Sequence, residues 1–299
     1  MDLASSSFTN AKPMKIKTPF SLAILVVFVS IGAVAAFGQT PKLLKRTTYK
    51  TDKFDFGVGG TVSIVGAPVG SIRVEGTQKS EIEISAEIEI QAPTEADLET
   101  LSKVSGFILE ESPGRTGIVS IGAYDKKSMG KAAKKFPKEL FGLPLKIDYV
   151  VKVPRYCDLQ IDSGKGDLTI SGVEGAMKIN SVDTKASLAL IGGGVNATFG
   201  AGSVDVTMPN RSWRGNAIDM ALNNGSMSVH LPWNLSGELD ATILRTGQIE
   251  NGLTELKPRD RKVPISDKLI AARAGNGGVP MKFTVGDGTL SLVPFTKPQ

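Results

Sequence analysis

The side chains of this 299-residue chain that could act as acids or bases include aspartates in short alternating segments. Asp162, Asp205 and Asp219 stand singly among Thr, Ser, Asn and Ala, and Asp167 and Asp183 fall at expected turns. Cleaving a polysaccharide needs two carboxylates, or a carboxylate and a basic side chain, clustered on neighbouring strands. Nothing in the sequence brings such a cluster together at these aspartates. We therefore predict no catalytic residues and a protein that is not an enzyme.

A second set of carboxylates lies in the segment Glu81-Ile-Glu-Ile-Ser-Ala-Glu-Ile-Glu-Ile90. Side chains of a strand alternate between its two faces, so the isoleucines predict a buried face and the glutamates a solvated one. No other segment supplies a partner for these glutamates. The pattern favours a surface strand over a pair of acid–base carboxylates.

The one histidine and the one cysteine complete the candidates for reactive side chains. His230 lies between Val229 and Leu231, which predicts a position on the solvent face of a strand. No second histidine or partner cysteine is present to build a metal site or a catalytic triad. Cys157 can form no intramolecular disulfide and is typical of a small buried hydrophobic residue. We assign no metal, no cofactor and no cofactor-binding residue.

Asp162, Asp205, Asp219 and His230 belong to two interleaved series of short predicted strands. The first series starts at Leu159, Met177, Val195 and Ile218, and the second starts at Leu168, Leu188, Val204 and Met227. Within each series the start recurs every 16 to 23 residues, with glycine or polar turns between neighbours. Such a period, with alternation inside each unit, is typical of stacked β-repeats. The sequence predicts a mostly β protein with a β-solenoid or β-helix-like stack, and periodicity alone leaves a meander of hairpins open.

Alternation within these strands predicts which side chains are buried. A strand too short to bury its apolar edge alone must stack on the next one. The expected buried face comprises Ile161, Leu168, Ile170, Met177, Ile179, Leu188 and Leu190. The expected solvent face comprises Gln160, Thr169, Lys178, Asp205 and Ser228.

The residues before this repeat predict an N-terminal β block over 39–153. A short helix is expected near 94–104, because Thr94 is a suitable N-cap and apolar residues recur at helical spacing. A basic insertion covers 126–138, the most lysine-rich stretch of the chain. It is interpreted either as a solvated insertion or as a contact for anionic lipid or a cell-wall polymer.

Residues 1–38 predict an export signal. Three lysines precede an apolar run from Phe20 to Ala36, and the small residues Ala36 and Gly38 fit cleavage before Gln39. If uncleaved, residues 19–36 are about long enough to remain as a membrane anchor. In either case we expect the rest of the chain outside the cytoplasm, in the periplasm, at the cell surface or secreted.

The charge of the chain argues against a nucleic acid partner. Removing residues 1–38 lowers Lys plus Arg from 35 to 32 and Asp plus Glu from 30 to 29, so the net charge falls from +5 to +3. Aromatic residues are not interleaved with the basic ones. The sequence therefore lacks the basic footprint of a nucleic-acid-binding protein.

A family resemblance lies at the entry to the repeat. A strand ending in Val151-Lys-Val-Pro154 leads into Asp158-Leu-Gln-Ile-Asp-Ser-Gly-Lys-Gly-Asp-Leu-Thr-Ile-Ser-Gly-Val-Glu-Gly175, and further Gly-Asp/Ser-apolar-x-apolar units follow. In this pattern the chain resembles the bacterial family of candidate adhesins of unknown function called DUF4097, over about 50–293 and most closely at 145–229. The resemblance implies an exported, β-solenoid-like fold and brings no catalytic residues with it. The chain departs from the pattern at 185–194 and 251–280.

We therefore expect a signal peptide at 1–38, a β block at 39–153 and a β-repeat domain at 154–299 with a surface loop at 251–280. The favoured function is an exported, non-catalytic cell-envelope or surface protein of the adhesin type that binds or scaffolds through a stacked β face. The alternatives are a polysaccharide-acting β-helix enzyme and an accessory or sensor protein of an envelope-stress system. An envelope polymer, a glycan and a surface protein all stay open as partners.

Overall fold

The computed structural model describes residues 43–57, 59–127 and 129–295. These residues belong to one compact unit, Pro41–Gln299. The expected signal peptide at 1–38, and its alternative as a membrane anchor at 19–36, lie outside the described residues. Among the residues that are described, no helix has the length and apolar character needed to cross a bilayer.

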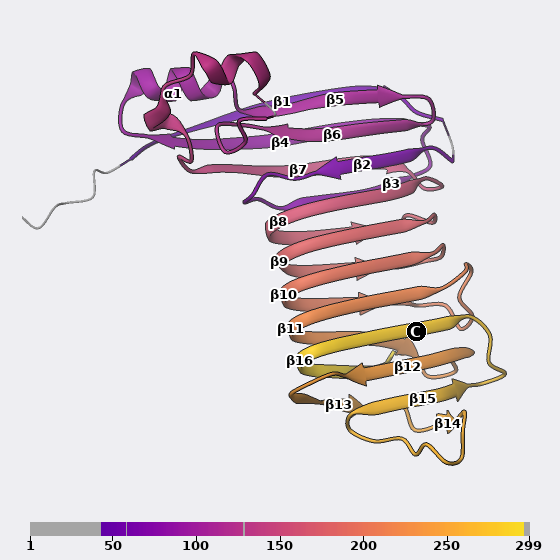
Figure 1. The fold of residues 1–299 in the computed structure, drawn as a ribbon. Helices are drawn as coiled ribbons and strands as arrows, with labels where there is room; N and C mark the ends of the chain where they lie inside the picture. Colours follow the sequence, from indigo (N-terminus) through magenta and orange to yellow (C-terminus); the bar gives the residue numbers. More distant parts are fainter. Residues whose placement is uncertain (1–42, 58, 128, 296–299) are drawn as a thin grey trace, which may run out of the picture. The chain divides into compact units, whose positions relative to one another are not determined.

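The described part of the chain is mostly β, as the sequence predicts, with an α-helix and two 3-10 turns between its strands (Figure 1). The elements are β1 (Leu44–Asp55), β2 (Thr61–Val65), β3 (Ile72–Thr77), β4 (Glu81–Ala92), α1 (Glu95–Ser102), β5 (Gly106–Ser112), β6 (Arg115–Ile121), η1 (Gly130–Lys134), η2 (Lys138–Leu140), β7 (Leu145–Pro154), β8 (Asp158–Ser171), β9 (Met177–Ala189), β10 (Val195–Thr207), β11 (Ile218–Pro232), β12 (Gly237–Ile243), β13 (Gly247–Asn251), β14 (Lys257–Pro258), β15 (Leu269–Ala274) and β16 (Pro280–Phe295).

Five long strands, β8, β9, β10, β11 and β16, stack in parallel and in register (Figure 1). The two expected series of short strands are the two halves of these strands. In β9 the buried positions are odd-numbered up to Ser181 and even-numbered from Thr184, a shift that requires a bend between the halves. Leu168 pairs with Ala186, so the second half of β9 begins its pairing two residues before the expected start at Leu188.

Glycine occupies most of the bends. Gly166, Gly202, Gly225 and Gly288 are aligned across the stack, and Thr184 takes the same place in β9. At Gly202 the backbone φ is +116°, and an added Cβ would lie 2.0 Å from the carbonyl oxygen of Thr184. Backbone strain and steric overlap therefore both exclude a side chain from Gly202. Thr184 instead donates a 2.6 Å hydrogen bond from its hydroxyl to the carbonyl oxygen of Gly166.

The halves of the bent strands continue into two walls of one open sheet. The first wall adds β5, β6 and β2 beside β8 at one end and β12, β15 and β14 beside β16 at the other. The second wall adds β1, β4, β7 and β3 beside β8, and β13 beside β16. β2 and β3 belong to the expected block 39–153, and β8 belongs to the expected repeat 154–299. Because β2 and β3 pair directly with β8, the two regions are joined by backbone hydrogen bonds.

The core lies between the two walls. The seven side chains expected on the buried face are all buried, with Met177 the most exposed of them at 3%. The residues expected on the solvent face are exposed or half-buried. A fully buried aliphatic side chain stabilises the fold by about 1.5–3 kcal/mol, so the regular ladder of such residues holds the strands together.

Helix α1 packs on β4 and β1 at one end of the second wall. Thr94 is its N-cap, as expected, because the Thr94 hydroxyl accepts a 3.1 Å hydrogen bond from the backbone N–H of Asp97. Leu98 and Leu101 are buried beneath it. Its position is therefore fixed by a cap and by two apolar side chains.

The basic insertion at 126–138 contains η1 and leads into η2. Leu140 is buried, and Met129 and Phe136 are half-buried against the core. The lysines of this insertion that the structure describes with their side chains are exposed. The insertion is thus partly packed through its apolar residues and solvated through its basic ones.

The expected surface loop at 251–280 contains the strands β14 and β15. β15 pairs antiparallel with β12 and buries Ile270, Ala272 and Ala274. Alanine has a low strand propensity, so alternation built on two alanines gives little signal in the sequence. The loop expectation is wrong for β15, whose strand conformation is set by pairing with β12.

Candidate functional site

Asp162 and Asp219, two of the carboxylates considered for catalysis, lie on the outer side of the first wall. Asn180 Nδ2 donates a 2.7 Å hydrogen bond to Asp162 Oδ1, and Lys282 Nζ lies 3.3 Å from Asp219 Oδ2. β8 and β11 are separated by three strand spacings, and Asp162 is in register with Ala221. Asp162 and Asp219 are therefore more than roughly 14 Å apart. That separation is too large for a pair acting on one glycosidic bond.

Asp205 lies on the second wall, where the structure brings it beside His230. His230 Nε2 lies 3.0 Å from Asp205 Oδ2, and the contact joins β10 to β11 at the surface. Within the part of the chain that the structure describes, no hydroxyl or thiol is hydrogen-bonded to this imidazole. The pair therefore lacks a nucleophile to activate, and it is an ion pair whenever His230 is protonated.

The glutamates of β4 face solvent among lysines, as the alternation predicts. Glu83 forms ion pairs with three lysines, whose Nζ atoms lie 3.0 Å (Lys152), 3.2 Å (Lys53) and 3.3 Å (Lys79) from its carboxylate oxygens. Hydrogen bonds from these lysines, with that from Lys152 the strongest, lower the pKa of Glu83 to about 2. A carboxyl group this acidic is ionised near neutral pH and is unsuited to act as a general acid there.

The remaining candidates are also separated from one another. Lys165 Nζ lies 3.6 Å from Asp183 Oδ2 at the bends of β8 and β9, and Asp167 is exposed. Cys157 is 1% exposed, and burial raises the pKa of its thiol to about 12. Across residues 43–57, 59–127 and 129–295, no group of three or more His, Cys, Asp or Glu side chains is placed to hold a metal ion.

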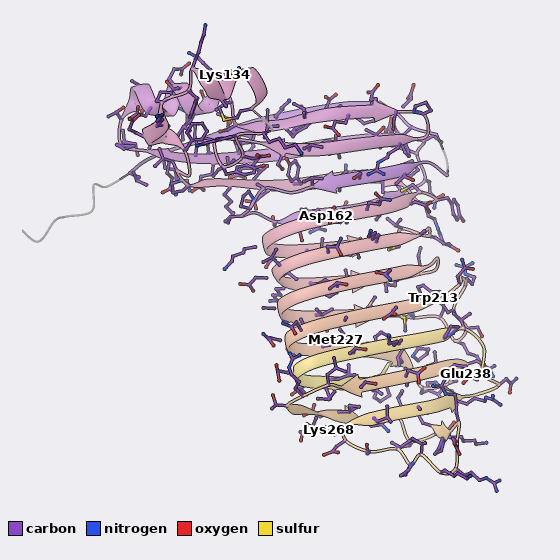
Figure 2. All side chains as sticks on the ribbon, in the orientation of Figure 1. Lys134, Asp162, Trp213, Met227, Glu238 and Lys268 are labelled. Carbon is purple, nitrogen blue, oxygen red and sulfur yellow. The ribbon has the colours of Figure 1, made fainter. Side chains whose placement is uncertain are left out.

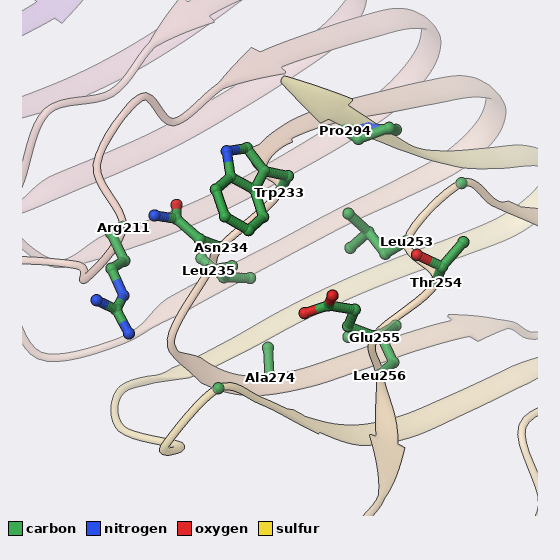
Figure 3. Close-up of a pocket in the computed structure, with 12 residues that line it drawn as sticks. Arg211, Trp233, Asn234, Leu235, Leu253, Thr254, Glu255, Leu256, Ala274 and Pro294 are labelled. Carbon is green, nitrogen blue, oxygen red and sulfur yellow. The ribbon is translucent and has the colours of Figure 1, made fainter. Parts of the chain in front are cut away.

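A concave site lies where the chain leaves the repeat rhythm after β11. It is a cavity of about 560 Å³, called here the Trp233 cavity (Figure 3). Its walls come from segments that follow β10, β11, β13 and β15 and from the end of β16. The lining residues are Arg211, Trp233, Asn234, Leu235, Gly252, Leu253, Thr254, Glu255, Leu256, Ala274, Gly275 and Pro294.

Backbone hydrogen bonds hold the walls of the Trp233 cavity in place. The backbone N–H of Leu235 donates to the carbonyl oxygen of Pro232 at 3.0 Å, which closes the turn that carries Trp233. The N–H of Ser236 donates to the carbonyl oxygen of Arg211 at 2.7 Å. On the other side, Gly252 donates to the carbonyl oxygen of Leu292 at 2.8 Å. The cavity is therefore formed by anchored segments and needs little rearrangement to receive a ligand.

The indole of Trp233 is available at this cavity. Its side chain belongs to a residue that is 61% exposed, whereas Trp213 is 6% exposed and its Nε1 donates a 2.8 Å hydrogen bond to the carbonyl oxygen of Gly193. Leu235 and Leu253 are buried and supply apolar surface nearby. A large exposed aromatic ring beside an apolar hollow is a common feature of binding sites.

Four polar side chains of the Trp233 cavity have no protein partner among the described residues. They are Arg211, Asn234, Thr254 and Glu255, none of which makes a side-chain hydrogen bond or ion pair within that part of the chain. In Figure 3, Trp233 and Asn234 stand on one side of the cavity and Thr254 and Glu255 on the other. Both donors and acceptors are thus free to bind a ligand that also covers the indole.

Comparisons with known proteins show no matching family model and no matching curated protein. Among solved structures, the chain is similar to a candidate cell adhesion protein from Clostridium sporogenes, with 9% identity, a TM-score of 0.46 and coverage of 84% of this chain and 100% of that one. It is also similar to a candidate adhesin from Bacteroides fragilis, with 11% identity, a TM-score of 0.31 and coverage of 82% and 97%.

Both of these structural neighbours are candidate adhesion proteins. DUF4097 itself is not shown, because no family model matches. With TM-scores below 0.5, the likeness carries no argument about function. The Trp233 cavity is the feature of this structure on which a function can be proposed.

The sequence did not predict the Trp233 cavity. Its residues come from positions 211, 233–235, 252–256, 274–275 and 294, and no motif connects them. One signal was available, since the tryptophan in Leu231-Pro-Trp-Asn-Leu235 directly follows a repeat strand. A tryptophan in a loop between strands can equally be buried, as Trp213 is, so exposure could be known only from the fold.

Proposed function

We propose that this protein is an exported, non-catalytic cell-envelope or surface protein of the adhesin type, built as a β-solenoid, and that it binds a saccharide in the Trp233 cavity. The observation that carries this proposal is the exposed indole of Trp233 beside four unpartnered polar side chains. Two aspartates close enough to act on one glycosidic bond would instead favour the alternative of a polysaccharide-acting enzyme. Asp162 and Asp219 lie on strands too far apart for it.

Saccharide chemistry fits this combination of groups. A pyranose ring has an apolar C–H face that can stack on an indole, and hydroxyl groups around its edge that both donate and accept hydrogen bonds. Trp233 offers the stacking surface, Arg211 and Asn234 offer N–H donors, and Glu255 offers a carboxylate acceptor. The volume of about 560 Å³ lies in the usual range for small-ligand sites.

The connectivity of the long strands supports the solenoid part of the proposal. β8, β9, β10 and β11 are consecutive in the chain, and each is the parallel neighbour of the next. A hairpin joins antiparallel strands, whereas consecutive parallel neighbours need a connection that returns the chain to its starting end. A coil whose every turn contains one bent strand meets this requirement, and a meander of hairpins does not.

Export rests on the sequence of residues 1–38, with its apolar run and small residues before Gln39. We propose cleavage there and a mature chain of 39–299 in the periplasm, at the cell surface or secreted. Cell fractionation tests this part. Full-length protein found only in the cytosol would contradict it.

Saccharide binding is tested with the mature chain, 39–299. A panel of bacterial and plant polysaccharide fragments identifies a ligand, and calorimetry then compares Trp233→Ala, Trp233→Phe and Tyr156→Ala. We expect Trp233→Ala to weaken binding about tenfold or more, because an anchoring aromatic ring is lost. Trp233→Phe should keep part of the affinity, since it keeps a ring for stacking.

Tyr156 is the matched control, an aromatic residue that is 51% exposed and lies outside the cavity. Tyr156→Ala should bind like the unsubstituted chain. If no saccharide binds, if only aromatic peptides bind, or if Trp233→Ala binds normally, the proposal is wrong. Release of cleaved products from the panel would favour the enzyme alternative.

A further inference from the structure

Five of the six lysines in the basic insertion that precedes β7 are described with their side chains. They are Lys126, Lys127, Lys134, Lys135 and Lys138, and all are exposed. Within the described residues, none of their ammonium groups forms an ion pair or hydrogen bond. By contrast, Lys53, Lys79 and Lys152 are each paired with carboxylates of β4. This cluster, called here the basic patch, is a positive surface whose five described lysines form no ion pair within the described residues.

Apolar contacts fix the segment that carries the basic patch. Leu140 is buried, and the rings of Phe136 and Phe141 pack edge to face with their centroids 5.1 Å apart. The ammonium group of Lys126 lies 4.7 Å from the centre of the Phe141 ring. Figure 2 shows Lys134 pointing away from the sheet. The exposed lysines therefore lie on a segment that is held against the fold by apolar side chains.

The basic patch lies at the end of the sheet where the chain enters the fold. Leu44 at the start of β1 pairs with Ala92, and Leu145 at the start of β7 pairs with Ile90, so both strands begin at the same end of β4. Residues 139–144 connect Lys138 of the patch to the start of β7. The covalent path from the apolar run, which ends at Ala36, to Leu44 can span at most roughly 29 Å.

We infer that the basic patch docks this protein on a membrane surface that contains anionic phospholipid. The patch has charge complementary to phosphate headgroups, and lysines near such a surface attract it additively. Before cleavage, and for as long as residues 19–36 remain in a bilayer, the short path to Leu44 keeps the fold close to that surface. The inference does not depend on saccharide binding in the Trp233 cavity.

Vesicle sedimentation of the mature chain, 39–299, tests this inference without the apolar N-terminal segment. The vesicles are phosphatidylcholine, alone or with about one third phosphatidylglycerol. The variant Lys127→Gln/Lys134→Gln/Lys135→Gln removes three charges from the patch. The control Lys178→Gln/Lys185→Gln/Lys262→Gln removes three charges from exposed, unpaired lysines elsewhere in the described chain, so the two variants have equal net charge.

We expect binding to the mixed vesicles and not to phosphatidylcholine alone. The patch variant should lose about 100-fold in partitioning, since each lysine near an anionic bilayer contributes roughly fivefold. The control variant and Trp233→Ala should keep most of the binding. Thermal melts of both triple variants should match that of the unsubstituted chain, because the replaced side chains are exposed.

Three results would overturn the inference. The first is absence of binding to the mixed vesicles. The second is an equal loss in the patch and control variants, which would indicate attraction by net charge alone. The third is displacement from vesicles by soluble polyphosphate at an equal phosphate concentration, which would identify a phosphate polymer as the partner in place of the membrane.

Discussion

Arg245 Nη2 lies 2.6 Å from Asp287 Oδ2, and this ion pair joins the turn between β12 and β13 to the bend of β16. The same guanidinium donates a 2.9 Å hydrogen bond to Asn223 Oδ1 on β11. Thr246 adds hydrogen bonds from its hydroxyl and its backbone N–H to Asp287 Oδ1, at 2.7 and 3.2 Å. The bend of β16 is thus clamped to both of its neighbouring strands in the sheet.

Asp287 should make stability depend on pH only in strong acid. The hydrogen bond from Arg245, followed by those from Thr246, lowers the pKa of Asp287 from 3.8 to about 2. A lowered pKa in the folded state stabilises the fold fully above the unfolded value, and the effect is lost as pH falls through the folded value. We therefore expect the melting temperature of the unsubstituted chain to exceed that of Asp287→Asn near neutral pH. The difference should disappear as the pH falls towards 2.

Thermal melts at several pH values measure this difference. Asp167→Asn is the control, because Asp167 is exposed and its side chain makes no hydrogen bond or ion pair among the described residues. Its melting temperature should follow that of the unsubstituted chain. A difference for Asp287→Asn that is unchanged at pH 2 would show that the ion pair is not its cause.

Gly202→Ala should destabilise the stack. The new Cβ would lie 2.0 Å from the carbonyl oxygen of Thr184, and the φ of +116° is strained for any residue with a side chain. We expect a loss of at least about 2 kcal/mol in the free energy of unfolding, measured by urea denaturation. Gly194→Ala is the matched control, since nothing lies within 4 Å of its added Cβ. Equal effects at the two positions would show that the bend does not require glycine.

The alternation of apolar and polar residues correctly predicted which side chains are buried in strands that have one buried face and one solvent face. Ile161, Leu168 and Leu190 are buried as predicted, because each half of a bent strand turns alternate side chains into the space between the walls. The register at β9 was harder to predict. Thr184 stands where the other strands have glycine, and Ala186 is a small residue in a column of larger ones, so the sequence pointed to Leu188 instead.

The parts that could not be predicted depend on contacts between distant segments. β15 is a strand because it pairs with β12, and its alternation rests on Ile270 and two alanines. The Trp233 cavity is assembled from segments up to 83 positions apart, from Arg211 to Pro294. Trp213 is buried and Trp233 is exposed because their loops pack differently against the rest of the fold. The local sequence around each tryptophan does not determine this packing.

Cys157 should be inert in the folded protein. Burial, with a smaller contribution from the Asp158 carboxylate, raises the pKa of its thiol to about 12. The reactive thiolate is therefore scarce at pH 8, and the sulfur is also shielded from reagents. We expect iodoacetamide to label Cys157 slowly at pH 8 and quickly once urea unfolds the chain. Mass spectrometry of the modified chain measures both rates, and rapid labelling without urea would contradict the burial.

Leu188 and Ala189 are adjacent in β9 but face opposite sides of the second wall. Leu188 is buried and Ala189 is exposed. Leu188→Asp removes an apolar side chain worth about 1.5–3 kcal/mol and places a carboxylate without a partner in the core. A domain of this kind has a total stability of roughly 5–15 kcal/mol, so we expect this variant to be largely unfolded.

Ala189→Lys is the paired test, because its side chain can extend into solvent. We expect its free energy of unfolding to change by no more than about 0.5 kcal/mol. Circular dichroism during urea denaturation compares the two variants. If Ala189→Lys destabilises the chain as much as Leu188→Asp, the outer face of the second wall is covered by protein, and that face cannot serve as a binding surface. If only Leu188→Asp unfolds the chain, the outer face tolerates substitution, and binding at that face can be tested separately from folding.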